Sequence, residues 1–521
     1  MARSKTTTPT GHGEVLTEPA YELWAGMASR NAAAARGWAF DLCGRPVSEV
    51  RAQARAQALE RAQAFSTRLG VPVRADASAD LIVVTGHQPQ LYHPGIWVKD
   101  FLLQRIAGDI GAAAIDLVVD SDGFDTVEVH SPCLRPDVRV CRAFLAVGTS
   151  QGCYACAPVP SADALRVFCA AAAEHLATLP APAIGHHFAR FCELLTSAAP
   201  DAANLAELVT FARRRFEATA HTDYLELPVT SMSRSRAFAT LVAHLALDAE
   251  GFADVYNAAL HDYRERTGTR SAVQPFPDLR REGDLVELPL WHLADGGRTT
   301  VWARTGGAPA LVVDGEVLCS LDGCDGAVDA LLESPLVLAP KALTLTMFAR
   351  LLVADLFIHG VGGGKYDQVT DDVFRRFFGI EPPAYAVASM TVYLPLGAHV
   401  VRDEEIEQAS MMLNRLKHNP DQMLDEVEFD TPQEHVRAVS LAQEKTALVA
   451  EIAAPEADRK ALGLRIREVN DELAGMLGPI ERQMREQLDQ LKQLREASDI
   501  LTDRTYPFCF WSPEEIADKA Y

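Results

Sequence analysis

Short apolar runs and longer amphipathic segments alternate in the first quarter of the chain. Residues 81–86 (LIVVTG) and 113–122 (AAIDLVVDSD) are rich in β-branched and other apolar side chains, which is typical of buried parallel strands. Between them, residues 96–108 (IWVKDFLLQRIAG) are amphipathic and end on glycine, which predicts a helix. The order strand, helix, strand predicts a parallel sheet, because parallel neighbours need a crossover connection.

Other parts of the chain show different patterns. Residues 1 to about 45 look irregular, whereas residues 48–70 are rich in Ala, Arg and Gln and predict a helix capped by Ser48. From about residue 161 to residue 266 the Ala- and Leu-rich composition predicts mainly helices. Strands and helices then alternate again, so we expect a later part of the chain to complete the sheet. The strands predicted there cover residues 284–290, 309–318, 335–340, 355–360 and 385–395, and the helices cover residues 341–352 and 366–379.

After about residue 401 the chain becomes rich in Glu, Gln, Arg, Lys and Leu. Apolar residues recur at alternating spacings of four and three, at Leu462, Ile466, Val469, Leu473 and Met476, which is coiled-coil patterning. Gly478 and Pro479 are expected to kink or end this helix. Residues 433–452 are a plausible antiparallel partner, and the length of the apolar stripe predicts a homodimer.

These patterns predict an α/β protein with a parallel sheet, divided into five segments. The expected segments are residues 1–160, the first part of the sheet domain with N-terminal helices; 161–283, a mainly helical insertion; 284–400, the second part of the sheet domain; 401–498, a coiled-coil dimerisation region; and 499–521, a C-terminal tail.

Composition narrows the class of protein. The 521 residues are 48% hydrophobic and 23% charged, which is ordinary for a globular protein. A net charge of −22 argues against nucleic-acid and anionic-membrane partners. The N-terminus has no apolar signal core and no apolar stretch reaches about 20 residues, so we expect a cytoplasmic location. Ten scattered cysteines include one CxxC pair, Cys153 and Cys156, and no metal site is predicted because further ligands do not accompany it.

The loop that follows the first predicted strand is the strongest functional candidate. Ligands bind at the carboxyl ends of strands in open α/β sheets, and the next helix directs its N-terminal amides there. Histidines in such a loop can act as acids, bases or phosphate donors, so we predict catalytic roles for His87, Gln88 and His93. Gly86, Tyr92 and Lys99 are predicted to bind substrate. The bland alternative is a packed loop whose histidines only cap the helix.

Acidic residues follow the second predicted strand. Clustered carboxylates can hold a substrate ammonium, bind a divalent cation or act as a base. We predict catalytic roles for Asp122 and Asp125 and substrate binding by Asp120 and His130. An acidic β-turn would have a similar sequence, since Asp and Gly favour turns.

A third loop, rich in glycine, follows a later strand at residues 358–372 (IHGVGGGKYDQVTDD). Glycines permit close backbone approach to an anion, and a lysine adds positive charge. The loop is not a P-loop, because its spacing is one residue short and Tyr366 replaces the Ser or Thr that would hold magnesium. The alternative is a tight strand-to-helix turn. The residues predicted to bind substrate here are His359, Gly362, Gly363, Gly364, Lys365, Tyr366 and Asp367.

Several segments together resemble the bacillithiol biosynthesis cysteine-adding enzyme (BshC) family. Residues 83–103 resemble its TGQQ-type loop and following helix, with His87 in place of the first glutamine. Residues 120–130 resemble its acidic segment, and residues 252–264 (FADVYNAALHDYR) resemble its Tyr-Asn helix. Residues 355–385 resemble its glycine-rich loop, helix and Pro-rich exit. The resemblance extends over roughly residues 81–498.

The resemblance implies a Rossmann-like parallel sheet core with helical insertions and a C-terminal antiparallel coiled coil that makes a homodimer. It also implies ligation of cysteine to an amino-sugar conjugate, glucosaminyl-malate. We therefore expect a ligase or transferase that joins an amino acid to an amine-bearing small molecule. The cofactor stays open, with ATP or another nucleotide as a candidate.

Two alternatives remain from the residues. The stretch HPG at His93 is similar to the HxGH signature of nucleotidyl transferases, although Ile96 occupies the last position. A nucleotidyl transferase is therefore the alternative enzyme. A non-catalytic dimeric adaptor that works through its coiled coil is the alternative from another class.

Overall fold

The computed structural model describes residues 7–74, 79–134, 137–149, 151–271, 274–294, 297–397, 401–418, 420–422, 424, 429, 431–454 and 456–521. The chain divides into two compact units. The first comprises Met1–Arg135, Val140–Tyr393 and Arg504–Tyr521, and the second comprises Pro136–Arg139 and Leu394–Asp503. The last 18 residues therefore belong to the first unit and are not a separate tail.

A six-stranded sheet forms the centre of the first unit. Five neighbouring strands are parallel, and β1 pairs antiparallel with β16 at one edge. The parallel arrangement predicted from the apolar runs is confirmed. Across the sheet the strands are β1 (Glu14–Glu18), β16 (Ala386–Thr391), β15 (Leu356–His359), β4 (Ile82–His87), β5 (Ala113–Val118) and β8 (Leu225–Pro228).

The order of the parallel strands reverses between β4 and β15. The chain passes from β4 to β5 and then to β8 in one direction, and later from β15 to β16 in the other. The strand β8 (LELP) lies within the segment predicted to be mainly helical, and its Leu- and Glu-containing sequence did not stand out from the surrounding helices. The carboxyl ends of the five parallel strands share one edge, which we call the carboxyl edge.

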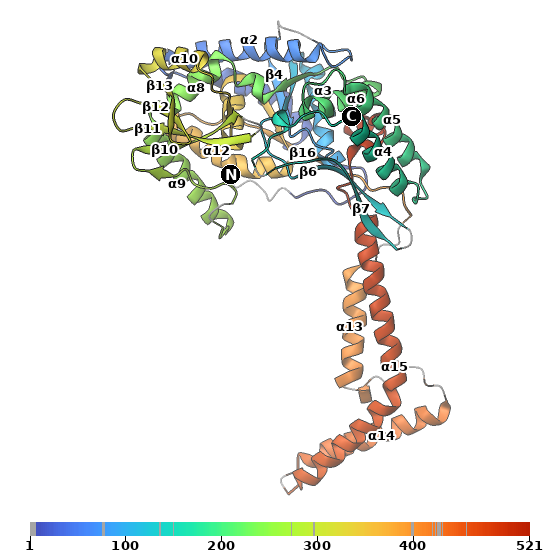
Figure 1. The fold of residues 1–521 in the computed structure, drawn as a ribbon. Helices are drawn as coiled ribbons and strands as arrows, with labels where there is room; N and C mark the ends of the chain where they lie inside the picture. Colours follow the sequence, from blue (N-terminus) through green and yellow to red (C-terminus); the bar gives the residue numbers. More distant parts are fainter. Residues whose placement is uncertain are drawn as a thin grey trace. The chain divides into compact units, whose positions relative to one another are not determined.

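Helices cover both faces of this sheet (Figure 1). One face packs against α2 and α8, and the other against α3, with α1 and α16 packed on α3. The helices of this unit are α1 (Trp24–Arg36), α2 (Val47–Ser66), α3 (Pro94–Ile110), α4 (Ala162–Leu176), α5 (Pro182–Ala198), α6 (Leu205–Glu217), α7 (Val229–Met232), α8 (Arg236–Leu247), α9 (Ala249–Thr267), α10 (Gly323–Glu333), α11 (Ala342–Phe348), α12 (Val361–Phe377) and α16 (Pro513–Ala520).

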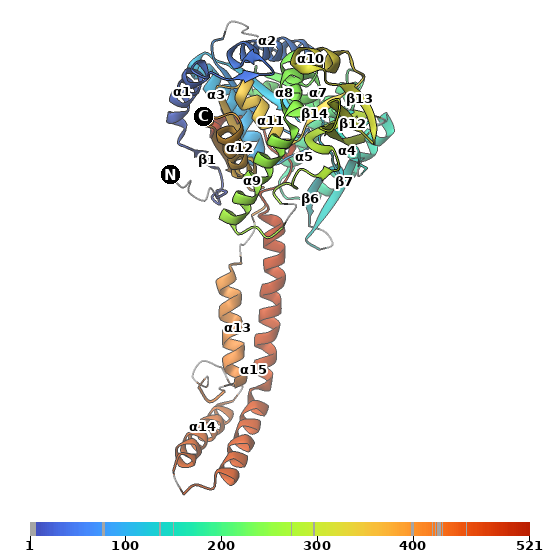
Figure 2. The ribbon, with the colours of Figure 1, turned by 90° about the vertical axis from the view of Figure 1, so that its left-hand side faces the viewer.

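A second, antiparallel sheet and two small hairpins complete the first unit. In the second sheet, β13 packs against α10 (Figure 2). Apolar residues of this sheet belong to the same core as those of α2 and α8. Its strands are β9 (Arg281–Glu282), β10 (Leu285–Ala294), β11 (Gly297–Arg304), β12 (Ala310–Val313), β13 (Glu316–Ser320) and β14 (Leu338–Pro340). The hairpins pair β2 (Asp41–Leu42) with β3 (Arg45–Pro46), and β6 (Thr126–Cys133) with β7 (Arg139–Val147).

The second unit is helical. It contains α13 (Asp403–His418), α14 (Pro432–Ile452) and α15 (Arg459–Leu501). Leu441 of α14 packs with Val469 and Leu473 of α15 in one apolar cluster, and Arg437 pairs with Glu472. The helix predicted to pair with residues 433–452 therefore does so. Pro479 does not end α15, which continues through it as a helix of 43 residues.

Three local expectations are wrong. The N-terminal region is not irregular, because it forms β1 and α1. The helix α2 begins after Pro46, whose side chain makes no cap, and Ser48 lies inside its first turn. The segment from Val361 is not a loop but the start of α12, with Gly360 as its N-cap. Among the described helices, none is long and apolar enough to cross a membrane.

Candidate functional site

His87 is the last residue of β4 and stands at the carboxyl edge. Its Nδ1–H donates a hydrogen bond to the carbonyl oxygen of Gln88 at 3.1 Å, which leaves the lone pair on Nε2. Burial lowers the pKa of His87 to about 3, and the charge of Lys99 lowers it further. The imidazole is therefore neutral at physiological pH and offers a hydrogen-bond acceptor.

The glycine before His87 is required by packing. A Cβ atom at Gly86 would lie 2.9 Å from both the Cβ atom and the carbonyl oxygen of Leu117 on β5. Any side chain there would push β4 away from its neighbour. Gly86 therefore allows the two strands to approach each other.

Gln88 joins the loops after β4 and β5 to the second sheet. Its Nε2 donates to Asp122 Oδ2 at 2.8 Å, and Arg298 Nη1 of β11 donates to Asp122 Oδ1 at 2.8 Å. The guanidinium of Arg298 also lies over the ring of Trp291, 5.0 Å from its centroid. The structure thus brings together Gln88 and Asp122, which were both predicted to be catalytic. Arg298 belongs to the same hydrogen-bonded group, and the sequence did not reveal it.

A cavity of about 440 Å³ opens at the carboxyl ends of β5 and β8. Val118 and Pro228 line it at the strand ends, and Asp120 lines it beside them. Thr230 donates its backbone N–H to Asp120 Oδ1 at 2.9 Å and its hydroxyl to Asp120 Oδ2. Burial raises the pKa of Asp120 to about 6, because desolvation outweighs these two donors.

The same cavity carries groups of both charges. Arg68 forms a bidentate pair with Glu207, with N–O distances of 2.8 and 2.6 Å. Arg61 and Arg234 also line the cavity, and Arg61 donates to the Arg234 carbonyl oxygen at 3.1 Å. Cations and carboxylates at one site suit a small ligand that carries both charges.

A second histidine, His359, is the last residue of β15 and lies at the carboxyl end of that strand. His359 Nε2–H donates to Asp367 Oδ2 at 2.8 Å, and Arg350 also pairs with this carboxylate at 2.6 Å. Burial lowers the pKa of His359. Burial alone would raise the pKa of Asp367, but Arg350 and His359 hold it well below its usual range. The carboxylate fixes the imidazole so that Nδ1 keeps its lone pair.

The glycines at the start of α12 have two different roles. Gly362 and Gly363 are exposed in the first turn, and a Cβ atom at Gly363 would lie 3.1 Å from His359 Nδ1. Gly364 is buried, and a Cβ atom there would lie 2.5 Å from Val387 of β16. The first pair leaves helix amides open at the carboxyl edge, whereas Gly364 serves packing alone.

Several predicted residues serve other purposes or lie elsewhere. His93 caps α3, because its Nδ1 accepts from the Gly95 N–H at 3.0 Å, as the bland alternative expects. Asp125 is exposed, and His130 lies on β6 against Thr505 at 3.4 Å. Other predicted residues are buried or face solvent: Tyr92 donates to Asp100, Lys99 lies beneath β4, and Lys365 and Tyr366 are exposed.

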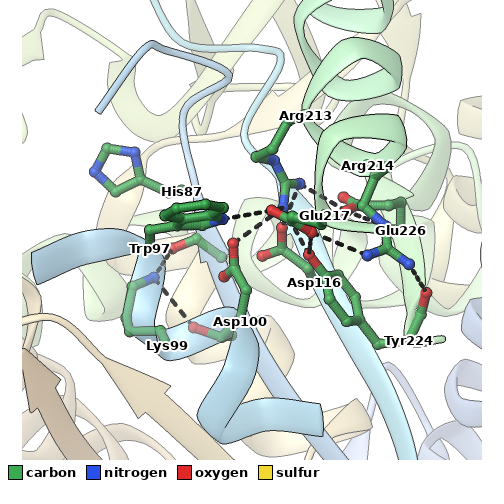
Figure 3. Close-up of polar contacts among 12 residues, drawn as sticks. His87, Trp97, Lys99, Asp100, Asp116, Arg213, Arg214, Glu217, Tyr224 and Glu226 are labelled. Atoms are coloured by element: carbon green, nitrogen blue, oxygen red, sulfur yellow. Dashed lines mark hydrogen bonds and ion pairs between the residues drawn. The ribbon is translucent and has the colours of Figure 1, made fainter. Parts of the chain in front are cut away.

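A network of buried charges lies beneath this edge (Figure 3). The side chains of Thr85, Asp116 and Glu226 form one cross-strand row, two residues before His87 and Val118 along the strands and therefore on the same face of the sheet. Helices α3 and α6 add the remaining charges. The charged members are each at most 4% exposed and comprise Lys99, Asp100, Asp116, Arg213, Arg214, Glu217 and Glu226.

Arg213 is the centre of this network. Its Nη1 donates to Asp100 at 3.0 Å and to Glu217 at 3.1 Å, and its Nη2 donates to Asp116 at 3.0 Å and to Glu226 at 2.6 Å. One guanidinium therefore joins two strands to two helices. Such a fork of donors suits a planar cation and not a lysine.

The carboxyl groups of the network differ in their affinity for protons. Burial raises the pKa of Asp100 to about 8 and the pKa values of Asp116 and Glu226 to about 7. Burial alone would also raise the pKa of Glu217, but Arg213 and Arg214 hold it below its usual value. Strongly shifted pKa values gather at functional sites more often than elsewhere.

Lys99 connects the network to the edge. Its Nζ donates to Thr85 Oγ1 at 3.1 Å and to the Gly86 carbonyl oxygen at 2.9 Å, and burial lowers its pKa. Lys99 is therefore a support beneath His87 and does not itself reach the carboxyl edge.

The sequence contained a signal for this network. Asp116 and Glu226 are single acids inside otherwise apolar strands, where a charged residue normally needs a buried partner. The pair Arg213 and Arg214 could supply it, although only the fold shows that they face these strands.

No protein-family model matches the chain, and no curated protein sequence matches it at a significant level.

Proposed function

We propose that the protein is a ligase or transferase that joins an amino acid to an amine-bearing small molecule at the carboxyl edge. The mixed-charge cavity at the carboxyl ends of β5 and β8 is the observation that carries this proposal. The strand order, which reverses between β4 and β15, also supports the Rossmann-like core and ligand position that the resemblance to the BshC family implies.

The cavity would bind the amino acid by both of its charges. Asp120 would hold the α-ammonium, and Arg61 and Arg234 would hold the carboxylate. With a pKa of about 6, Asp120 is mainly ionised at neutral pH and can attract a cation. A ligand with only one of these charges would leave either Asp120 or the two arginines without a partner.

His87 would orient the attacking amine. Its backbone is paired in register with Val118, which lines the cavity, so His87 lies on the strand next to the cavity. Because its pKa is about 3, the imidazole stays neutral at physiological pH and its Nε2 keeps a lone pair that can accept a hydrogen bond. His87 would therefore accept a hydrogen bond from the substrate amine, while His359 and the first turn of α12 would face an anionic group.

Activation of a carboxylate needs a co-substrate. Amide formation from a free carboxylate releases water and is unfavourable in water, so a nucleotide such as ATP is the candidate activator. The open amides of Gly362 and Gly363 would bind one of its phosphates, since a helix N-terminus favours anions. The nucleotidyl transferase alternative has less support, because His93 is occupied as a helix cap.

The helical unit would make the homodimer. Val436, Leu464 and Leu494 are apolar but are 68%, 54% and 53% exposed in the single chain. A second copy would cover them in a coiled coil. Light scattering of the full chain tests this proposal, which a monomer at micromolar concentration would contradict.

The activity is tested by mass spectrometry of reactions that contain cysteine, glucosaminyl-malate and ATP. We expect a condensation product that is heavier than the sugar conjugate by cysteine minus water. His87→Ala should lower the rate about a hundredfold, because the attacking amine loses the acceptor that orients it and a misplacement of about 1 Å costs roughly that much. His186→Ala on the surface of α5 is the matched control.

If no combination of amino acid and amine gives a product, the adaptor alternative gains support. If a product forms equally fast in His87→Ala, the carboxyl edge at β4 is not the reaction site.

A further inference from the structure

The β6–β7 hairpin and the end of α4 bring two sulfurs and an imidazole together. Cys133 ends β6, Cys141 lies on β7 and His175 is in the last turn of α4. Their ligand atoms all lie within 4.8 Å of one another. The sequence spacing conceals this group, since 33 residues separate Cys141 from His175.

One ring nitrogen of His175, Nδ1, is buried and has no hydrogen-bond partner in the described part of the chain. The end of α4 is fixed independently, because Leu134 donates its N–H to Thr178 Oγ1 at 3.2 Å, and Thr178 donates to the His175 carbonyl oxygen at 2.8 Å. A buried nitrogen acceptor without a donor points to a ligand at this position.

The donor set is that of a zinc site. Zinc binds thiolate sulfur at about 2.3 Å and imidazole nitrogen at about 2.0–2.1 Å in tetrahedral geometry. Two sulfurs on one such ion lie about 3.8 Å apart, which follows from the Zn–S length and the tetrahedral angle. In the structure the two sulfurs are joined in a disulfide, so they would separate to this distance after reduction, while His175 already lies within 4.8 Å of both. The C-terminal end of α4 also favours a cation, because the helix dipole is negative there.

We propose that Cys133, Cys141 and His175 bind one zinc ion when the two cysteines are reduced. The disulfide between Cys133 and Cys141 in the structure is then the oxidised, metal-free state. A small dithiol reduces it: the protein disulfide takes up two electrons and two protons, and the dithiol becomes a disulfide. Zinc then displaces the two thiol protons, and water completes the coordination.

This site is separate from the carboxyl edge. It ties a surface hairpin to α4, so its effect is on local stability and not on the ligation chemistry. Bound metal stabilises the folded state by mass action, because the unfolded chain does not hold the three ligands together.

Cobalt(II) reports such a site directly, because thiolate-to-cobalt charge transfer and tetrahedral d–d bands are visible by absorption. The full chain is reduced with a phosphine and titrated with cobalt(II), and zinc is then added. We expect one cobalt ion per chain with bands of two thiolates, which zinc abolishes. Zinc should also raise the melting temperature of the reduced chain.

The variants identify the ligands. Changes around metal ligands typically weaken binding about 10- to 100-fold, so Cys133→Ser, Cys141→Ser and His175→Ala should each weaken it at least as much. The control is the double variant Cys169→Ser with Cys192→Ser, which removes the neighbouring pair of thiols on α4 and α5. It should bind cobalt as the unchanged chain does.

Two results would overturn the proposal. One is that the reduced chain, folded by circular dichroism, binds no cobalt at the expected stoichiometry. The other is that binding survives all three ligand variants or disappears in the control double variant. His175→Ala leaves both cysteines in place, so it tests the site even if the cysteine variants fold poorly.

Discussion

The two faces of the central sheet are held by different forces although they belong to the same strands. Towards α2 and α8 the strands present Val84, Ile115 and Leu227, which lie in one large apolar core. Towards α3 and α6 they present Asp116 and Glu226, which meet Arg213. Apolar burial is non-directional, whereas forked hydrogen bonds fix distances and angles.

This difference indicates what the charged face is for. Replacing buried ion pairs with well-packed apolar groups is often neutral or stabilising, so stability alone does not explain the network. The charged face lies directly beneath His87, and Lys99 donates to the carbonyl oxygen of Gly86. We infer that the network positions the carboxyl edge, while the apolar face supplies most of the driving force for folding.

The largest effect is expected from removing the centre of the network. Arg213→Met would leave four buried carboxyl groups without their shared cation. Breaking one buried pair typically costs about 3–5 kcal/mol, so the free energy of unfolding should fall by at least that much. Urea denaturation measures it, with Arg190→Met on the exposed side of α5 as the control. Equal losses of unfolding free energy in both variants would show that the network contributes no more to stability than an exposed ion pair.

A smaller loss is expected on the apolar face. Leu227→Ala removes a fully buried side chain and leaves a cavity, which typically costs about 2–5 kcal/mol. Because no charge is involved, the loss should be nearly the same at pH 5 and pH 8. A loss that depends strongly on pH would contradict the separation of the two faces.

The pH dependence sharpens the comparison further. The folded pKa of Asp116, about 7, lies above its value of about 3.9 in an unfolded chain. Its stabilising contribution is therefore complete below about pH 4 and is lost as the pH rises through about 7. Asp116→Asn stays neutral, so the unchanged chain should lose stability relative to this variant across that range. Parallel stability curves for the two proteins would contradict the raised pKa.

The sequence predicted the sheet better than the site. The runs at residues 81–86 and 113–122 are apolar enough to mark strands, and both are found. The strand β8 was not predicted, because its sequence LELP lies between helices and resembles them in composition. Residues 360–365 looked like a loop because glycine is a poor helix former, but the packing of Gly364 on Val387 holds the first turn of α12.

Site residues were predictable only where they follow a strand directly. His87 ends β4, Gln88 follows it, and Asp120 and Asp122 follow β5, so the structure places all four along one edge. Arg61, Arg213 and Arg298 come from distant parts of the chain, and no local pattern distinguishes them from surface arginines. Their roles depend on tertiary contacts that the one-dimensional pattern does not contain.

Calorimetric titration of amino acids into the full chain and into Asp120→Asn tests the central claim most directly. The account predicts that an amino acid binds the unchanged chain in the cavity at the ends of β5 and β8. Affinity should fall about tenfold or more in Asp120→Asn, since a lost charged contact is worth about 1.5–3 kcal/mol, and should be unchanged in the exposed control Asp163→Asn. Binding of equal strength to all three proteins would contradict the placement of the ligand at the carboxyl edge.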